Sequence, residues 1–251
     1  MDLGAGSFTD EPGAEFFFDP MTSLPPLGTC SVFTSGAADL TSVLLAQLPN
    51  ARTSGRPLDA GASVQIAGVK GPRAISRLAD SGGGYFAALG GANPTPGQPS
   101  TPLFLDETAY TVEGSAGRDV STFTMILRVP AQPNWTNRDR LTTVNRAQGA
   151  TLTWTGGDPA VQAVKIVGQS VDSQTNASRI FVCLAPADSG SFTVPPAILG
   201  SLPASNPQVS DQSFLLLGVV PSGEVPAFTA AGLDAGFAFF GSLQGITATY
   251  R

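Results

Sequence analysis

The sequence contains no histidine, and this absence excludes more chemistry than any other feature. Without an imidazole, neither a Ser-His-Asp triad nor a Cys-His pair can form, and nearly all zinc hydrolases lose a required ligand. Paired carboxylates such as Glu113 and Asp119 could still support glycoside hydrolysis, although surface turns are the ordinary place for such acids. We therefore expect a protein that is not an enzyme and has no metal and no cofactor.

Charge is also scarce, because only 13% of the residues are charged and the 13 lysines and arginines are scattered. Nucleic-acid binding requires a concentrated basic face, so we predict no nucleic-acid partner for this chain of net charge −6. No apolar run is long enough for a membrane-spanning helix, which needs about 18 residues. The low charge, the acidic balance and the Ser/Thr-rich segments favour an extracellular or cell-surface location. The first residues do not form a signal peptide, so either a signal has been removed or this location is wrong.

Cysteine is limited to Cys30 and Cys183. Their distance in the sequence excludes a CxxC redox motif and a zinc site built from cysteine. One alternative is a disulfide, which would close a loop of about 150 residues and constrain the unfolded chain by ~4–5 kcal/mol in the entropy model. The other is two separate buried thiols.

Glycine and proline are frequent, with 29 and 21 residues, and they separate short segments of strand character. Val120–Val129 alternates with one slip, and 195–203 is typical of a single helical turn bracketed by prolines. We predict an all-β protein whose strands are Cys30–Thr34, Ala62–Ala67, Arg73–Leu78, Tyr85–Leu89, Leu103–Leu105, Ala109–Glu113, Val120–Val129, Ala150–Thr155, Ala163–Val167, Arg179–Leu184, Ser213–Val220 and Gly245–Tyr250.

A proline-bracketed segment at 130–133 is the best candidate for a linker. It divides the chain into an N-terminal extended segment (1–27), a β-sandwich domain (28–130) and an immunoglobulin-like β-sandwich domain (134–251).

The extension contains Phe16, Phe17 and Phe18 in succession. Neighbouring side chains of a strand point to opposite faces, so both faces of this segment need to be covered. It is either a strand packed inside its own domain or a strand donated to another subunit.

Trp135 and Trp154 are the side chains that a sugar-binding face would use for stacking. A single tryptophan in an alternating strand, such as that around Trp154, is more often part of a core. Glycan binding is therefore a possible function, and core packing is the alternative.

Three motifs carry a resemblance to a known group: Leu152–Gly157 (LTWTGG), Phe181–Pro186 (FVCLAP) and Gly190–Pro196 (GSFTVPP). With Leu58–Gly61 and Tyr110–Val112, they resemble uncharacterised exported β-rich proteins of acidobacterial type over roughly residues 28–251. The resemblance implies export and β architecture, and it implies no activity.

These observations favour a structural subunit of an extracellular assembly, such as a filament or surface layer, formed by self-association into a homopolymer. A low-charge surface rich in Ser, Thr and Gly can be buried between subunits at little desolvation cost. The alternative is a carbohydrate-binding or adhesive surface module. A carboxylate enzyme is a third hypothesis, which requires two acids facing each other across a cleft.

Overall fold

The computed structural model describes residues 2–10, 24–34, 56–78, 84–91, 101–172, 177–205, 213–223 and 225–251. Regular structure in these ranges is nearly all β-strand, so the prediction of an all-β protein is confirmed. The helical segments described are η1 (Arg138–Arg140), η2 (Ala187–Ser189) and α2 (Pro196–Gly200). The chain forms two compact units: unit 1 comprises Met1–Phe17, Ala46–Pro130 and Val225–Phe240, and unit 2 comprises Phe18–Leu45, Ala131–Glu224 and Gly241–Arg251.

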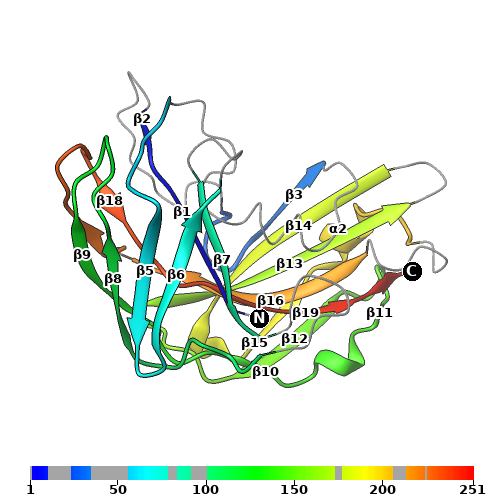
Figure 1. The fold of residues 1–251 in the computed structure, drawn as a ribbon. Helices are drawn as coiled ribbons and strands as arrows, with labels where there is room; N and C mark the ends of the chain where they lie inside the picture. Colours follow the sequence, from blue (N-terminus) through cyan, green and yellow to red (C-terminus); the bar gives the residue numbers. More distant parts are fainter. Residues whose placement is uncertain are drawn as a thin grey trace. The chain divides into compact units, whose positions relative to one another are not determined.

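Unit 1 is built on a six-stranded sheet in which every neighbouring pair is antiparallel (Figure 1). In spatial order its strands are β1 (Asp2–Ser7), β7 (Gly84–Gly90), β6 (Gly71–Arg77), β5 (Ser63–Gly68), β8 (Ala109–Gly114) and β9 (Phe123–Arg128). Two short pairs complete the unit, β2 (Thr9–Asp10) with β4 (Arg56–Pro57) and β17 (Ala227–Phe228) with β18 (Gly236–Phe237).

Period-two alternation gives this sheet one buried face. Val64 and Ile66 of β5 are buried, whereas Ser63 and Gln65 between them are partly exposed. The buried face forms a core with residues from the flanking segments, and Phe228 of β17 stacks on Phe123 with 4.5 Å between the ring centroids. This buried cluster contains Phe8, Leu58, Ala60, Val64, Ile66, Ile75, Tyr85, Leu89, Phe104, Tyr110, Val120, Phe123 and Val129.

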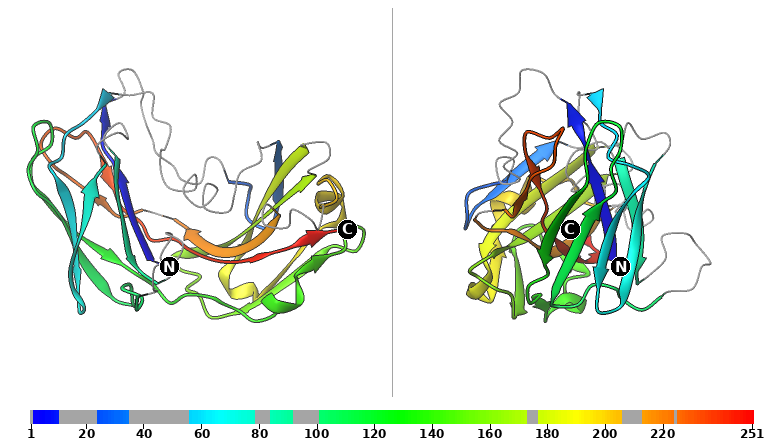
Figure 2. Two further views of the ribbon diagram at one scale, coloured as in Figure 1. Left: turned by 45° about the vertical axis from the view of Figure 1, so that its right-hand side comes forward. Right: turned by 60° about the vertical axis from the view of Figure 1, so that its left-hand side comes forward.

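Unit 2 contains a five-stranded antiparallel sheet and two smaller sheets. The large sheet has the order β19 (Ser242–Thr247), β16 (Phe214–Pro221), β13 (Gln162–Asp172), β14 (Ala177–Pro186) and β3 (Cys30–Thr34). Figure 2 shows β16 and β19 running side by side. The smaller sheets are β10 (Asn134–Trp135), β12 (Ala150–Thr155) and β15 (Ser191–Val194), and the parallel pair β11 (Thr143–Val144) and β20 (Thr249–Tyr250).

The core of unit 2 lies between these sheets. Val164 and Ile166 of the large sheet share one cluster of buried residues with Leu152 and Val194 of the three-stranded sheet and with Tyr250 of the parallel pair. The opposite face of the large sheet is covered as well, since the residues of β13 from Gln162 to Val171 are all buried. β13 is therefore buried on both faces, although its buried residues include Gln162, Lys165, Gln169 and Ser170.

The units differ from the domains expected from the sequence. β3, expected in the first domain, pairs with β14 in unit 2, and the segment Val225–Phe240, expected in the second, belongs to unit 1. The expected extension 1–27 begins with β1, which pairs with β7 of its own unit, with one register shift between Asp2 and Leu3. The glycines of β1 weaken the strand signal in its sequence. Gly4 has a packing reason, because a Cβ atom there would clash with the Ile75 side chain.

Candidate functional site

Cys30 and Cys183 form a disulfide, which decides between the two alternatives left open by the sequence. They are directly opposite in the register of β3 and β14, with 4.0 Å between their Cα atoms. Cys183 is fully buried in the core of unit 2, and Cys30 packs against the same core. The bond therefore ties β3, an edge strand of five residues among the described strands, to its neighbour β14.

Trp135 and Trp154 are brought together, but inside the core rather than on a binding surface. They are opposite each other in β10 and β12, and only 4% and 3% of their surfaces are exposed. Each indole N–H already has an acceptor, which is Asn137 Oδ1 at 3.0 Å for Trp135 and the Ala187 carbonyl at 2.8 Å for Trp154. The hypothesis that these two residues stack on a sugar is wrong, because their rings are buried.

The tyrosines of the described strands are also used internally. Tyr85, Tyr110 and Tyr250 are each 2% exposed or less. The Tyr85 hydroxyl donates to the Gly61 carbonyl at 2.8 Å, and the Tyr250 hydroxyl donates to the Phe214 carbonyl at 2.8 Å. Such bonds satisfy the polar end of a buried ring.

The three phenylalanines Phe16, Phe17 and Phe18 lie outside the described residues. The donated-strand hypothesis for them therefore stays a prediction.

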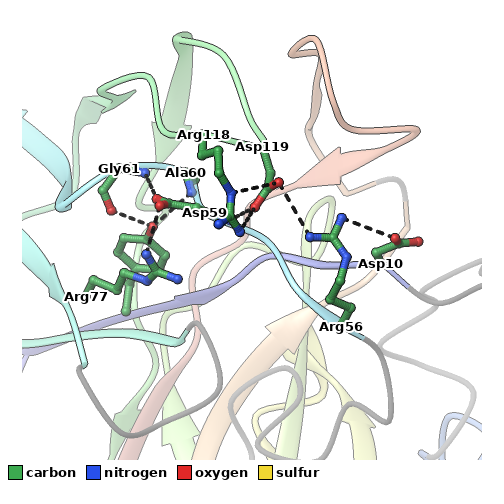
Figure 3. Close-up of polar contacts among 9 residues, drawn as sticks. Asp10, Arg56, Asp59, Ala60, Gly61, Arg77, Arg118 and Asp119 are labelled. Atoms are coloured by element: carbon green, nitrogen blue, oxygen red, sulfur yellow. Dashed lines mark hydrogen bonds and ion pairs between the residues drawn. The ribbon is translucent and has the colours of Figure 1, made fainter.

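A cluster of arginines and aspartates that the sequence did not predict lies in unit 1 (Figure 3). We call it the arginine–aspartate cluster, and its members are Asp10, Arg56, Asp59, Arg77, Arg118 and Asp119. Arg56 lies between Asp10 and Asp119, with its guanidinium nitrogens 3.4 and 3.5 Å from their carboxylate oxygens (Figure 3). Arg77 pairs with Asp59 at 3.1 Å.

Two loops hold this cluster together through their backbones. The Asp59 N–H donates to Asp119 Oδ2 at 2.9 Å, and the Asp119 N–H donates to the Asp59 carbonyl at 3.0 Å. The loops approach so closely that a Cβ atom on Gly117 would collide with the Asp59 backbone. The sequence offered two weak signals for this site, the Leu58–Gly61 motif and the neighbouring charges Arg118 and Asp119.

The electrostatics of the cluster favour fixed charges over proton transfer. The hydrogen bond from Arg118 and then that from the Asp59 N–H lower the pKa of Asp119 to about 2. Burial raises the pKa of Tyr85, although the hydrogen bond that its oxygen accepts from the Ala60 N–H acts in the opposite direction. A general acid at neutral pH needs a carboxyl group with a raised pKa, so Asp119 is suited to hold two loops and not to donate a proton.

Glu113, the other acid that we considered for catalysis, does not join this cluster, and neither does Asp106. Glu113 is exposed on β8, and Asp106 forms an ion pair with Lys70 at 2.6 Å. Over the described ranges, no group of three or more histidine, cysteine, aspartate or glutamate residues is arranged to hold a metal ion. No helix within these ranges is long and apolar enough to cross a membrane.

Unit 2 contains a buried lysine. Lys165 is in the middle of β13, and only 8% of its surface is exposed. Burial lowers the pKa of its amine to about 8.

Comparisons of the chain with protein-family models, with curated proteins and with solved structures find no match. The resemblance to exported acidobacterial proteins therefore stays a prediction.

Proposed function

We propose that this chain is a non-catalytic structural subunit of an extracellular assembly, formed by self-association. The observation that carries the proposal is the exposed face of the six-stranded sheet in unit 1. Small and uncharged polar residues cover most of it, including Gln65, Ser76 and Thr124, and its charged side chains are Glu113 and Arg128. A face with so little charge can be buried against another subunit without a large desolvation cost.

The disulfide supports the extracellular part of this proposal, since such bonds form and persist in oxidising compartments. An immunoglobulin-like sandwich is our interpretation of unit 2, supported by the core that its sheets share.

The carbohydrate-binding alternative has lost its main support, because both tryptophans that motivated it are buried. The chemistry of the arginine–aspartate cluster likewise supports a role in stability, since its carboxylates are paired with arginines. A structural role is therefore the proposal that we retain.

Sedimentation velocity tests the proposal on the purified, oxidised protein over a thousandfold range of concentration. We expect the average mass to rise with concentration, with elongated or sheet-like particles visible by negative-stain electron microscopy at the upper end. A single monomeric species at every concentration and ionic strength would contradict it.

A further inference from the structure

β9 is an edge strand of the sheet in unit 1, and the structure shows which of its peptide groups point toward β8 and which point away from it. β8 lies on one side of it, and no described strand pairs with its other side. The Val129 N–H donates to the Thr108 carbonyl at 2.9 Å, which makes these two residues a hydrogen-bonded pair. Because such pairs alternate along an antiparallel ladder, the peptide groups of Thr124, Ile126 and Arg128 point away from β8.

Among the described residues, neither a bulge nor a paired strand protects this edge. The register between β8 and β9 is regular, with no bulge, and the side chain at the middle of the strand, Ile126, is 50% exposed. The β17–β18 hairpin contacts β9 through the stacking of Phe228 on Phe123, whose ring is on the buried face. A regular strand edge with an apolar centre is a template for another strand.

The geometry points to a second copy of this chain as the partner, paired antiparallel with β9 about a two-fold axis at Ile126. In that register Ile126 faces its own symmetry mate, and Thr124 faces Arg128 of the second copy. An axis at Arg128 would instead place two guanidinium groups opposite each other, which is unfavourable. Of these two registers, the one centred at Ile126 is favoured.

Charge complementarity supports the same register. Glu113 is directly opposite Thr124 in the β8–β9 ladder and on the same exposed face. Arg128 of the second copy would be the next residue in that row, two strand spacings or roughly 10 Å from Glu113 between Cα atoms. Extended glutamate and arginine side chains bridge this distance, so the two-fold axis creates two equivalent Glu113–Arg128 ion pairs.

This inference rests on the proposed function and names one of the contacts by which subunits associate, since a two-fold contact alone closes at a dimer. The test is sedimentation equilibrium of the full chain and of Ile126→Lys, which places two ammonium groups at the axis. We expect the variant to dissociate at least about tenfold more readily. Val69→Lys is the matched control, because Val69 is 79% exposed but lies in the turn between β5 and β6, and we expect it to associate like the wild type.

A charge exchange gives an independent readout. At low salt, Glu113→Arg and Arg128→Glu should each weaken association severalfold, and the double variant should recover it, because the pairs form again with reversed sign. Both substituted residues are on an exposed face, and unchanged thermal unfolding of the monomer will show that the fold is intact. Failure of the double variant to recover association would overturn the contact.

The outcomes also separate the contact from the wider function. Large assemblies that survive Ile126→Lys would overturn the β9 contact and leave the structural role standing. If the wild type forms dimers but no larger assemblies, and Ile126→Lys is monomeric, the β9 contact is supported and the extended assembly is contradicted. A wild type that is monomeric throughout would contradict both.

Discussion

Asp119 stabilises unit 1 because its two carboxylate oxygens bind several groups at once. Oδ2 accepts from the Asp59 N–H at 2.9 Å and from Arg118 at 3.1 Å, and Oδ1 lies 3.5 Å from Arg56. The pKa of Asp119 is about 2 in the folded protein and is near its ordinary value when the chain is unfolded. The stabilisation is therefore present above pH 4 and is lost as the pH falls through about 2.

We predict that Asp119→Asn lowers the free energy of unfolding at pH 7, and that its difference from the wild type shrinks between pH 4 and pH 2. Urea titrations at a series of pH values measure this difference. Asp139→Asn is the matched control, because Asp139 also pairs with a neighbouring arginine but is 88% exposed. An Asp119→Asn effect that is the same at pH 7 and pH 2 would contradict the role of the ionised carboxylate.

Lys165 has the opposite effect on stability. Burial lowers the pKa of its amine to about 8, whereas the unfolded chain keeps its proton up to an ordinary value near 10.5. Burial of the charged amine thus costs about 3 kcal/mol at pH 7, and this cost disappears as the pH rises from about 8 to 10.5. We predict that Lys165→Met is more stable than the wild type by about 1–3 kcal/mol at pH 7, with a smaller difference at pH 10. Denaturant unfolding measures it, and the exposed Lys70→Met should bring no gain.

β3 depends on a covalent bond to keep its place in the large sheet of unit 2. It has five residues and, among the described strands, one neighbour, and the Cys30–Cys183 disulfide joins it to that neighbour. We predict that the double variant Cys30→Ala/Cys183→Ala loses about 2–5 kcal/mol of unfolding free energy. A reductant should bring the wild type to the same value and leave the variant unchanged. Equal stability of the oxidised wild type and the variant would show that pairing alone holds β3.

Strands whose side chains alternate on one buried face were the predictable part of this fold. The slip in the alternation of Val120–Val129 disappears because β9 begins only at Phe123. Leu103–Leu105, predicted to be a strand, is not one, since the backbone N–H groups of Phe104 and Leu105 donate to the Asp2 carboxylate instead of a neighbouring strand. Such a partner, about a hundred residues away, leaves no local pattern.

Among the candidate functional residues, only the disulfide could be anticipated from the sequence, because it depends on a single residue type. Two cysteines allow one pairing, so the disulfide was among the alternatives. The arginine–aspartate cluster joins residues from Asp10 to Asp119, and pairing between distant surface charges has no periodicity to reveal it. The tryptophans were ambiguous because a ring on a strand has the same sequence pattern whether its face is covered or open.

At the scale of the whole molecule, each unit takes strands from distant parts of the chain, so the linker at 130–133 does not separate two independent domains. A fragment of residues 1–130 lacks the β17–β18 hairpin, including the ring of Phe228 on Phe123 and the bond from the Ser121 N–H to the Ala231 carbonyl at 2.9 Å. A fragment of residues 131–251 lacks β3 and leaves the edge of β14 and the thiol of Cys183 uncovered.

We therefore predict that neither fragment unfolds cooperatively alone, and that the two recover a cooperative transition when they are expressed together under oxidising conditions. Circular dichroism and amide-proton dispersion measure this for each fragment and for the pair. A well-dispersed spectrum of either fragment by itself would show that its main sheet is sufficient. The segments supplied from the other side of residue 130 would then add stability to a fold that already exists.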